Sequence, residues 1–236
     1  MSDSIRSFYD DYAPSQAERG INQRHLRIME WLEQFGLRNG MRVLEIGCGI
    51  GTQTELLADK IPNGQILAID ISPRSIEMAR QRLAGKTHVE LRCGDIVTLN
   101  VDGTFDMIVL PDVLEHIPTV DHAVLFQKLA KLLDPDGQVL IHIPAPQYLE
   151  WITRHHPERL QVIDQPLHMG ALIPNFTQAG LYPHHVQHYG LWTADPDAAI
   201  IALRHYRTEL PFHPVPPPTN WIGGVRRRLA KYRGRA

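Results

Sequence analysis

Residues 43–54, VLEIGCGIGTQT, constrain the fold of this chain more than any other stretch. An apolar segment runs into glycines at positions 47, 49 and 51, and a segment of helical character follows. Glycine allows a tight turn and a close approach of the backbone to a ligand, and the free N–H groups of the next helix can bind polar groups. The stretch therefore predicts a strand, a ligand-binding turn and a helix in that order.

Short apolar segments, partly β-branched, alternate with helical segments on both sides of this motif. Strands are predicted at 42–46, 66–69, 89–93, 107–110 and 139–143, and helices at 21–36, 52–60, 73–83 and 120–133, the last ended by the turn at 134–137. The first helix has an apolar stripe at three-residue steps, formed by Leu26, Met29, Leu32 and Phe35. Regular βαβ spacing predicts a parallel sheet with helices on both faces.

The pattern changes after residue 144. A segment rich in aromatic residues, His and Pro predicts a small cap insertion at about 145–174, and Pro174 is expected to interrupt a helix before Gly180. Strands at 181–189 and 199–206 complete an α/β fold with a doubly wound, seven-stranded, mostly parallel sheet. The expected organisation is an N-terminal helical lid at 1–40, a main domain at 41–209, and a Pro-rich linker with a basic tail at 210–236.

Charge is distributed unevenly along the 236 residues. The formal net charge is −2, and six cations follow residue 220 with no acid among them, so the preceding chain carries −2 − 6 = −8. An acidic body argues against nucleic-acid binding, and no DNA partner is expected. The tail is expected to be a solvated terminus or a weak contact for polyanions or a membrane surface. The sequence predicts no oligomeric state.

Only two cysteines occur, Cys48 and Cys93, each at the end of a predicted strand. A third strand should separate these two strands, too far for a disulfide. Free thiols suit a reducing compartment, and the first residues lack the basic and apolar regions of a signal peptide. The sequence therefore predicts a cytoplasmic protein.

The acidic residues and the glycine spacing show which features this chain shares with dinucleotide-binding proteins and which it does not. Asp70 closes the second strand about twenty positions after the glycines, where a carboxylate can accept both hydroxyls of a ribose, as it also does in dinucleotide-binding proteins. The third glycine, however, comes one position early for G-x-G-x-x-G, and Thr52 occupies the sixth position. Glu45 before the glycines and Asp95 after the third strand also favour a different nucleotide ligand.

The segments VLEIGCGIG, AIDIS, CGDI, FDMIVLPDVLEHI and LDPDGQVLIHIP, in this order, resemble the successive motifs of class I S-adenosylmethionine-dependent methyltransferases. The resemblance is strongest to the subgroup of ubiquinone-biosynthesis and amino-sugar methyltransferases, and it covers roughly residues 40–145. It implies a cofactor, S-adenosylmethionine, bound at the carboxyl edge of the sheet.

The resemblance also implies a role for each motif position. The glycine turn would pass the methionine portion, with Glu45 beneath it. Asp70 would hold the ribose hydroxyls, and Asp95 would accept from the adenine amino group. The residues implied to bind the cofactor are Glu45, Gly47, Cys48, Gly49, Gly51, Asp70, Ile71, Asp95, Ile96, Pro111 and Asp112. Cys48 is expected to be a small packing residue and not a nucleophile, and a capping role for Asp95 stays open.

His116 is the candidate catalytic base. It follows the fourth strand at the edge where α/β active sites gather, and its ordinary pKa suits proton transfer near neutrality. The alternative is a surface histidine before Pro118. Two roles stay open for Phe8, Tyr9 and Tyr12: a lid over the cofactor or an ordinary packing stripe.

Thirteen histidines raise the possibility of a metal site. His155 and His156 are adjacent, whereas His184 and His188 should share one face of a strand and His185 the other. None of these spacings matches a known ligand pattern, and no metal is expected.

The function expected from these features is methyl transfer to an oxygen or nitrogen of a small metabolite. Signatures of DNA-methylating enzymes are absent after the fourth strand, where the chain reads LPDV. A protein or peptide substrate, and a non-catalytic nucleotide-binding protein, are the alternatives. The acceptor is not predicted, because residues 145–174 depart from the patterns that the chain otherwise resembles.

Overall fold

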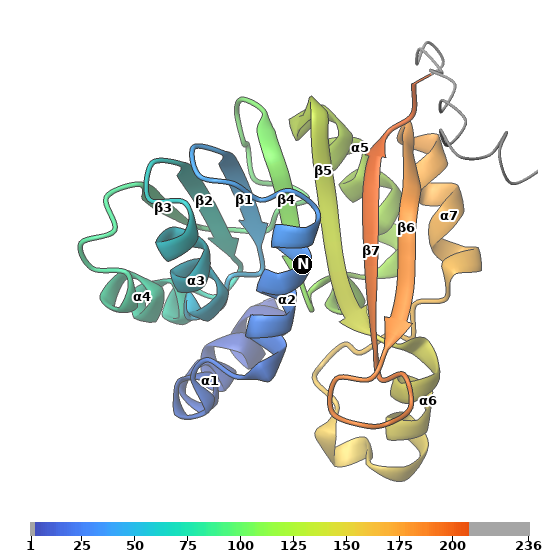
Figure 1. Cartoon of the computed structure of the whole chain (residues 1–236). Coiled ribbons are helices and arrows are strands. Elements are labelled where there is room, and N and C mark those ends of the chain that lie inside the picture. The colour runs from blue at the N-terminus through green and yellow to red at the C-terminus, as the bar shows by residue number, and fades with distance from the viewer. Residues whose placement is uncertain (1–2, 208–236) are drawn as a thin grey trace, which may run out of the picture. The chain divides into compact units, whose positions relative to one another are not determined.

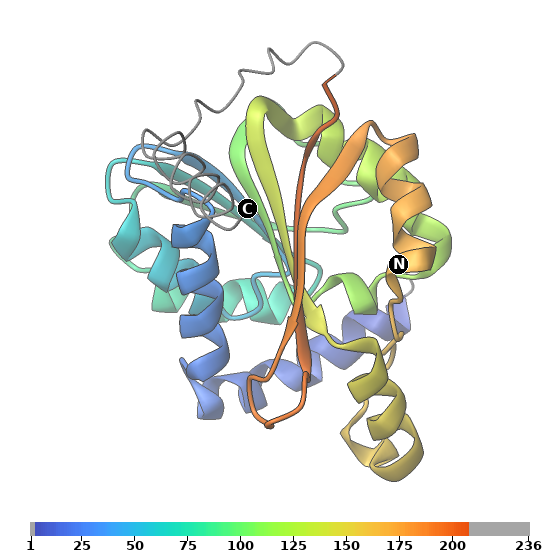
Figure 2. The same ribbon diagram turned by 45° about the vertical axis from the view of Figure 1, so that its right-hand side comes forward.

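The computed structural model describes residues 3–207, so the predicted Pro-rich linker and basic tail at 210–236 lie outside the described residues. Within this range the chain forms one seven-stranded sheet with helices on both sides (Figures 1 and 2). The strands are β1 (Arg42–Ile46), β2 (Gln65–Asp70), β3 (Val89–Cys93), β4 (Phe105–Pro111), β5 (Leu133–Pro144), β6 (Leu181–Tyr189) and β7 (Ala198–His205). The helices are α1 (Asp3–Arg19), α2 (Gln23–Gln34), α3 (Thr52–Lys60), α4 (Pro73–Arg82), α5 (His122–Leu132), α6 (Pro146–His155) and α7 (Met169–Gln178). The short 3₁₀ helices are η1 (Leu114–His116), η2 (Thr119–Asp121) and η3 (Pro157–Arg159).

The strand order is β3-β2-β1-β4-β5-β7-β6. Strands β1 to β5 pair in parallel, and β7 is antiparallel to both β5 and β6. This confirms the predicted α/β fold and its mostly parallel sheet. The order reverses between β1 and β4, so the loops after these two strands leave toward opposite faces and open a crevice at their carboxyl ends.

Each face of the sheet has its own hydrophobic core, because alternate residues of a strand point to opposite sides. In β1, Leu44 packs with α5 and α7, whereas Val43 packs with α2 and α3. Both side chains are fully buried. No helix within residues 3–207 is long and apolar enough to cross a membrane.

Helix α2 buries Met29 and Leu32 of the predicted stripe but not Leu26. Leu26 is 51% exposed, and the inward face is made by His25, Ile28, Met29, Trp31 and Leu32. Three residues turn a helix by 300°, so a strict three-residue repeat drifts by about 60° at each step and carries Leu26 to the side opposite Phe35. Asn22 caps the helix, because its side chain accepts from the N–H of Arg24 at 3.0 Å.

The turn predicted at 134–137 lies inside β5 and does not precede it. Leu133 pairs with Phe105, and pairing resumes at Gln138 opposite Met107, so the four residues between them bulge out of the ladder. A side-chain carbon on Gly137 would lie 3.0 Å from the carbonyl oxygen of Phe105, so glycine suits the bulge.

The expectation that Pro174 interrupts the helix before Gly180 is wrong. Pro174 lies inside α7, which continues to Gln178. Proline in a helix costs about 3 kcal/mol, but α7 buries Leu172 and Phe176 almost completely in the core, and this burial offsets the cost. Because α7 joins the layer that covers the sheet, the segment outside that layer is shorter than the predicted cap. It consists of α6, η3 and the coil up to residue 168.

A bulge in β6 changes the predicted grouping of histidines. Pro183 pairs with Leu203 and His185 with Ala202, so His184 is the extra residue. Both His184 and His185 consequently contact Phe35 at the end of α2, and His188 lies on the other face. Within residues 3–207 no group of three potential ligands is placed to hold a metal ion.

Cys93 ends β3 and Cys48 lies in the loop directly after β1, so a third strand separates their positions as predicted. Strand β2 lies between β1 and β3, and both Cys48 and Cys93 are free thiols.

We expect Phe176→Ala to lower the free energy of unfolding by about 3–5 kcal/mol, because it removes a fully buried ring. That ring meets Phe126 edge to face at 4.7 Å. Ile173→Ala on the same helix is the control, since Ile173 is 42% exposed and should change stability by about 0.5 kcal/mol. Urea unfolding measures both values, and similar losses would contradict the assigned core.

Candidate functional site

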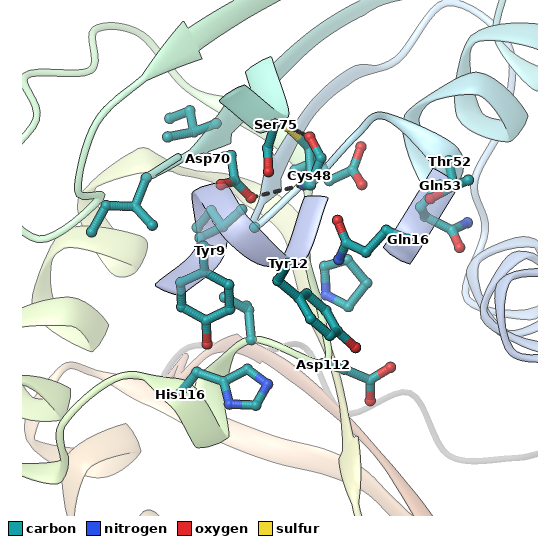
Figure 3. A pocket seen from close by; sticks show the side chains of 18 of the residues that line it. Tyr9, Tyr12, Gln16, Cys48, Thr52, Gln53, Asp70, Ser75, Asp112 and His116 are labelled. Atoms are coloured by element: carbon teal, nitrogen blue, oxygen red, sulfur yellow. Dashed lines mark hydrogen bonds between the residues drawn. The ribbon is translucent and has the colours of Figure 1, made fainter. Parts of the chain in front are cut away.

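A cavity of about 600 Å³ opens at the carboxyl edge of the sheet, where the strand order reverses. We call it the main cavity. Its wall includes the loop after β1, the ends of β2 and β4, and one face of α1 (Figure 3). Every residue predicted for the site lines it except Gly51.

The glycine loop after β1 shapes one end of the main cavity. Gly47 has a φ of 77°, and a side-chain carbon there would lie 2.6 Å from Val113, so only glycine fits. The N–H groups of Gly47 and Cys48 donate to the carbonyl oxygen of Ile69 at 2.7 and 3.0 Å. These bonds hold the loop against the end of β2.

Gly51 has a packing role in place of the predicted cofactor contact. It is the N-cap of α3 with a φ of 82°, and a side-chain carbon on it would lie 3.2 Å from Ala79 of α4. Its lack of a side chain therefore brings α3 and α4 close together.

Asp70 at the end of β2 joins two loops of the site. Its Oδ2 accepts from the N–H of Gly49 at 2.8 Å, and its Oδ1 accepts from the N–H of Ser72 at 2.9 Å. Burial raises the pKa of Asp70, although these two hydrogen bonds oppose the shift. Each carboxylate oxygen retains a second lone pair for a ligand hydroxyl.

The opposite wall is formed after β2 and β3 by Ile71, Asp95 and Ile96. Asp95 Oδ1 accepts from the N–H of Val97 at 2.9 Å. Asp95 therefore has the capping role that the sequence left open. Ile96 is buried. An apolar surface beside an acceptor oxygen suits a flat heterocycle with an amino group.

Beneath the glycine loop lie buried polar groups that lack partners within residues 3–207. Glu45 is fully buried, and neither of its carboxylate oxygens has a hydrogen-bond partner. The side-chain amide of Gln53 is likewise buried and unpaired. Burial raises the pKa of Glu45 to about 7. Unpaired buried polar groups are costly, so they indicate that a polar ligand completes this part of the cavity.

Helix α1 contributes Tyr9, Tyr12 and Gln16 to the lining of the main cavity. This position is compatible with both predicted roles, a lid and a packing stripe. Phe8 packs on both tyrosine rings, so the residues also form a packing stripe. Asp10 fixes the helix to the start of α4, because its Oδ1 accepts from the Ser72 hydroxyl at 2.5 Å.

Asp112 follows β4 and has a φ of 52°, the one positive value for a non-glycine residue within residues 3–207. Such conformations are strained and persist where the surroundings hold them. Its Oδ1 accepts from His142 Nδ1 at 2.5 Å, and its Oδ2 pairs with Arg24 at 2.8 Å. Burial raises the pKa of Asp112, but His142 and Arg24 outweigh burial and hold it well below its usual range.

A chain of hydrogen bonds continues from Asp112 across the sheet. Nδ1 of His142 donates to Asp112, and its Nε2 shares a hydrogen bond of 2.7 Å with the Tyr189 hydroxyl. Burial raises the pKa of Tyr189, so its hydroxyl stays protonated and remains a donor. The carboxylate is thus oriented by β5 and β6 as well as by α2.

His116 on η1 is buried and lies at the wall of the main cavity. Its Nδ1 donates to the carbonyl oxygen of Ile163 at 2.6 Å and lies 3.1 Å from Asp164 Oδ1. A carbonyl only accepts, so Nδ1 carries a proton and Nε2 is the nitrogen left for a ligand. Glu115 Oε1 is 3.8 Å from Nε2, too far for a hydrogen bond.

The charges around His116 decide its protonation. Burial lowers its pKa, but the Glu115 carboxylate and the bonds to Asp164 and Ile163 outweigh burial and raise the pKa to about 9. Burial raises the pKa of Glu115 itself to about 8, so Glu115 and His116 titrate as a pair above neutral pH. The Tyr9 ring lies 6.1 Å from the imidazole, and the Tyr9 hydroxyl is buried without a partner within residues 3–207.

A second cavity of about 230 Å³ shares part of this wall. Arg24, Asp112, His116, Gln161 and Trp192 line both cavities. Two ligands could therefore meet at these residues, one from each side.

Sequence reasoning missed several residues of the site. His142 could have been found, because it is a polar residue inside the buried strand segment VLIHIP. Gln53 could also have been found, because it is a polar residue two positions after the last glycine of the turn. Arg24 and Asp164 carried none, since only the tertiary structure brings them to Asp112 and His116.

Comparison with known proteins agrees with this geometry. Residues 43–137 match a family described as a methyltransferase domain. Trans-aconitate 2-methyltransferase of Methylobacterium nodulans is 32% identical over 134 residues, covering 57% of this chain and 50% of that protein. Ubiquinone biosynthesis O-methyltransferase of Leptothrix cholodnii is 29% identical over 133 residues, covering 54% and 55%. The chain thus spans about half the length of these relatives.

Among solved structures, magnesium protoporphyrin IX methyltransferase of Synechocystis PCC 6803, crystallised with SAH, superposes with a TM-score of 0.67 at 19% identity. The superposition covers 84% of this chain and 97% of that one. The chain therefore shares the Rossmann-like fold of that structure.

We expect Asp164→Asn to lower the pKa of His116 from about 9 toward its ordinary value, because it removes a negative charge beside Nδ1. Glu158→Gln is the control, since Glu158 is an exposed acid that faces His156. Imidazole ¹⁵N chemical shifts followed against pH measure the change. An unaltered titration in Asp164→Asn would show that Asp164 does not hold the proton on the ring.

Proposed function

We propose that this chain, whose residues 43–137 match a methyltransferase-domain family, is an S-adenosylmethionine-dependent methyltransferase acting on an oxygen or nitrogen of a small molecule. The observation that carries the proposal is the arrangement of Asp70, Asp95 and the glycine loop around one cavity that adjoins a second. One cavity suits the nucleoside cofactor, and the other suits its acceptor.

The residues of the main cavity fit the cofactor. Asp70 would hold the ribose hydroxyls, Asp95 the adenine amino group, and Ile71 and Ile96 the faces of the adenine. Gly47, Cys48 and Gly49 would adjoin the methionine portion. The unpaired groups of Glu45 and Gln53 support this end, because an amino acid offers both donors and acceptors to them. When bound, S-adenosylmethionine supplies a methyl group activated by its positive sulfur.

The thiol of Cys48 has no chemical role in this proposal. Its side chain is 4% exposed, and burial raises its pKa well above the ordinary value, which keeps it protonated and unreactive.

Methyl transfer to a nucleophile depends mainly on alignment and on the exclusion of water. The aromatic residues of α1 cover the main cavity. Asp112 is held in a fixed orientation by Arg24 and His142 at the border of both cavities. We infer that these residues position the acceptor for an in-line approach.

His116 is proposed to receive the proton of an acceptor hydroxyl at Nε2. The bonds from Nδ1 to Ile163 and Asp164 fix the ring in the required tautomer. Proton acceptance requires the neutral imidazole, and a pKa near 9 makes that form scarce at neutral pH. The rate should therefore rise with pH through this range. An amine acceptor with a free lone pair would depend on His116 much less.

The size of the second cavity supports a small acceptor over a protein or peptide. At about 230 Å³ it is below the roughly 300–1,000 Å³ of typical small-molecule pockets. A long polypeptide segment would need an open groove.

We expect Asp70→Ala to weaken S-adenosylmethionine binding by about 1–3 kcal/mol, because the ribose would lose a charged acceptor. Asp59→Ala is the control, since Asp59 pairs with Lys86 on the surface. Calorimetry with S-adenosylhomocysteine and with NAD measures which of the two the natural protein prefers. The same titration with S-adenosylhomocysteine gives the affinity of each variant. Equal affinity of folded Asp70→Ala and the natural protein would remove the cofactor assignment.

The acceptor is best identified by incubating the protein with methyl-labelled S-adenosylmethionine and fractionated cell extract. With an acceptor hydroxyl in hand, we expect His116→Gln to lower the single-turnover rate about a hundredfold. The natural protein should gain activity up to about pH 9, and the variant should lose this dependence while binding cofactor normally. A variant that keeps the rate and the pH profile would show that His116 is not the base.

A further inference from the structure

The walls of the second cavity indicate what kind of acceptor it takes. Residues of η1, α6, η3 and the loop between β6 and β7 surround it. Its volume of about 230 Å³ accommodates only part of a typical metabolite. The remainder must therefore lie at the mouth, where the side chains decide which molecules bind.

Four carboxylates line this cavity, and three of them are paired or hydrogen-bonded within the described part of the chain. Burial raises the pKa of the fourth, Glu115, to about 8. The ion pairs described above hold Asp112 and Asp164, and Glu115 lies 3.8 Å from the imidazole beside it. Asp197 accepts the N–H groups of residues 191–193 at 2.7, 2.8 and 2.9 Å. The acidic lining therefore does not by itself create a site for a cationic ligand.

Two arginines line this cavity, Arg24 and Arg159. Arg24 forms an ion pair with Asp112, so Arg159 is the arginine that could bind a ligand. It ends η3 and lines the cavity, and its charge lowers the pKa of the adjacent exposed Glu158 without a close ion pair between the two side chains. The adjacent acid, Glu158, lies 3.3 Å from His156 Nδ1. A guanidinium at the mouth of a cavity suits a carboxylate, which it can bind through two parallel hydrogen bonds.

Aromatic side chains stand at the same mouth. Trp192 lines this cavity as well as the main cavity, and it is 55% exposed. Tyr148 lines it from α6 and is stacked on Trp151, with centroids 6.5 Å apart and planes 19° from parallel. Trp151 is itself 46% exposed. Flat apolar surfaces of this kind favour a planar aromatic ligand.

We infer that the second cavity binds acceptors with an aromatic ring and a carboxylate, the ring contacting Tyr148 or Trp192 and the carboxylate bound by Arg159. The inference rests on the proposed function, because the neighbouring cofactor makes this an acceptor site. The atom that is methylated would lie at the inner end, near Asp112 and His116.

The test measures binding of matched probes to the protein saturated with S-adenosylhomocysteine, by saturation-transfer NMR and calorimetry. The probes are benzoate, 3,4-dihydroxybenzoate and cinnamate, each with its carboxamide and its saturated-ring acid, together with the aliphatic acids succinate and malonate. We expect the best aromatic acid to bind at least about tenfold more tightly than its carboxamide and its saturated analogue.

Variants assign the preference to residues. Arg159→Gln should bring the acid and its carboxamide within about twofold, whereas Arg154→Gln should not, because Arg154 lies outside the lining and is 72% exposed. Trp192→Leu should weaken the aromatic acid about fivefold or more. Tyr206→Leu is its control. Tyr206 is 67% exposed and follows the last residue of β7, whereas the loop with Trp192 precedes the first residue of that strand.

The inference is overturned if the natural protein shows no preference for aromatic acids, or if the preference survives in Arg159→Gln. Tighter binding of the aliphatic acids would also overturn it. S-Adenosylhomocysteine binding is measured first, and its absence would contradict the proposed function itself. Normal cofactor binding without the probe preference contradicts only the acceptor class.

Discussion

The site depends on one carboxylate at the end of a central strand. Asp70 accepts from Gly49 on one side and from Ser72 on the other, so it joins the glycine loop after β1 to the start of α4. Ser72 in turn donates its hydroxyl to Asp10 of α1. The parallel register of β1 and β2 brings these loops to the same edge of the sheet. The floor, one wall and the cover of the main cavity are therefore held by connected hydrogen bonds.

Charge in the site is organised around two buried acid–histidine pairs. In one pair Asp112 is held by His142, and in the other His116 is held by Asp164. The first keeps a carboxylate ionised at the border of the two cavities. The second fixes a proton on Nδ1 and leaves Nε2 without a hydrogen bond, and together with the Glu115 carboxylate, the larger cause, it raises the pKa of the imidazole above neutrality. Burial alone would have shifted both groups the opposite way, so the partners determine the chemistry available.

Local signals explain what could be predicted from the sequence. The apolar run at 42–46, the glycines after it and the cap at Ser72 specify β1, α3 and α4 without reference to the rest of the chain. Failures came where tertiary contacts decide. Leu26 was placed on the wrong face of α2, the bulge at His184 reversed a strand pattern, and Pro174 was tolerated because Phe176 anchors its helix. The partners of Asp112 and His116 come from distant segments of the chain, so no local sequence pattern predicts these contacts.

The hydrogen-bond chain from Tyr189 through His142 to Asp112 has a consequence for building hybrid proteins. It runs from Tyr189 at the end of β6 through His142 of β5 to Asp112, which follows β4 and borders both cavities. The two halves are thus not interchangeable modules. A chimaera that takes residues 145–207 from a relative without a hydroxyl at the position of Tyr189 would leave His142 Nε2 unpaired beneath the site. Recombination points between such enzymes should therefore keep β5 and β6 together.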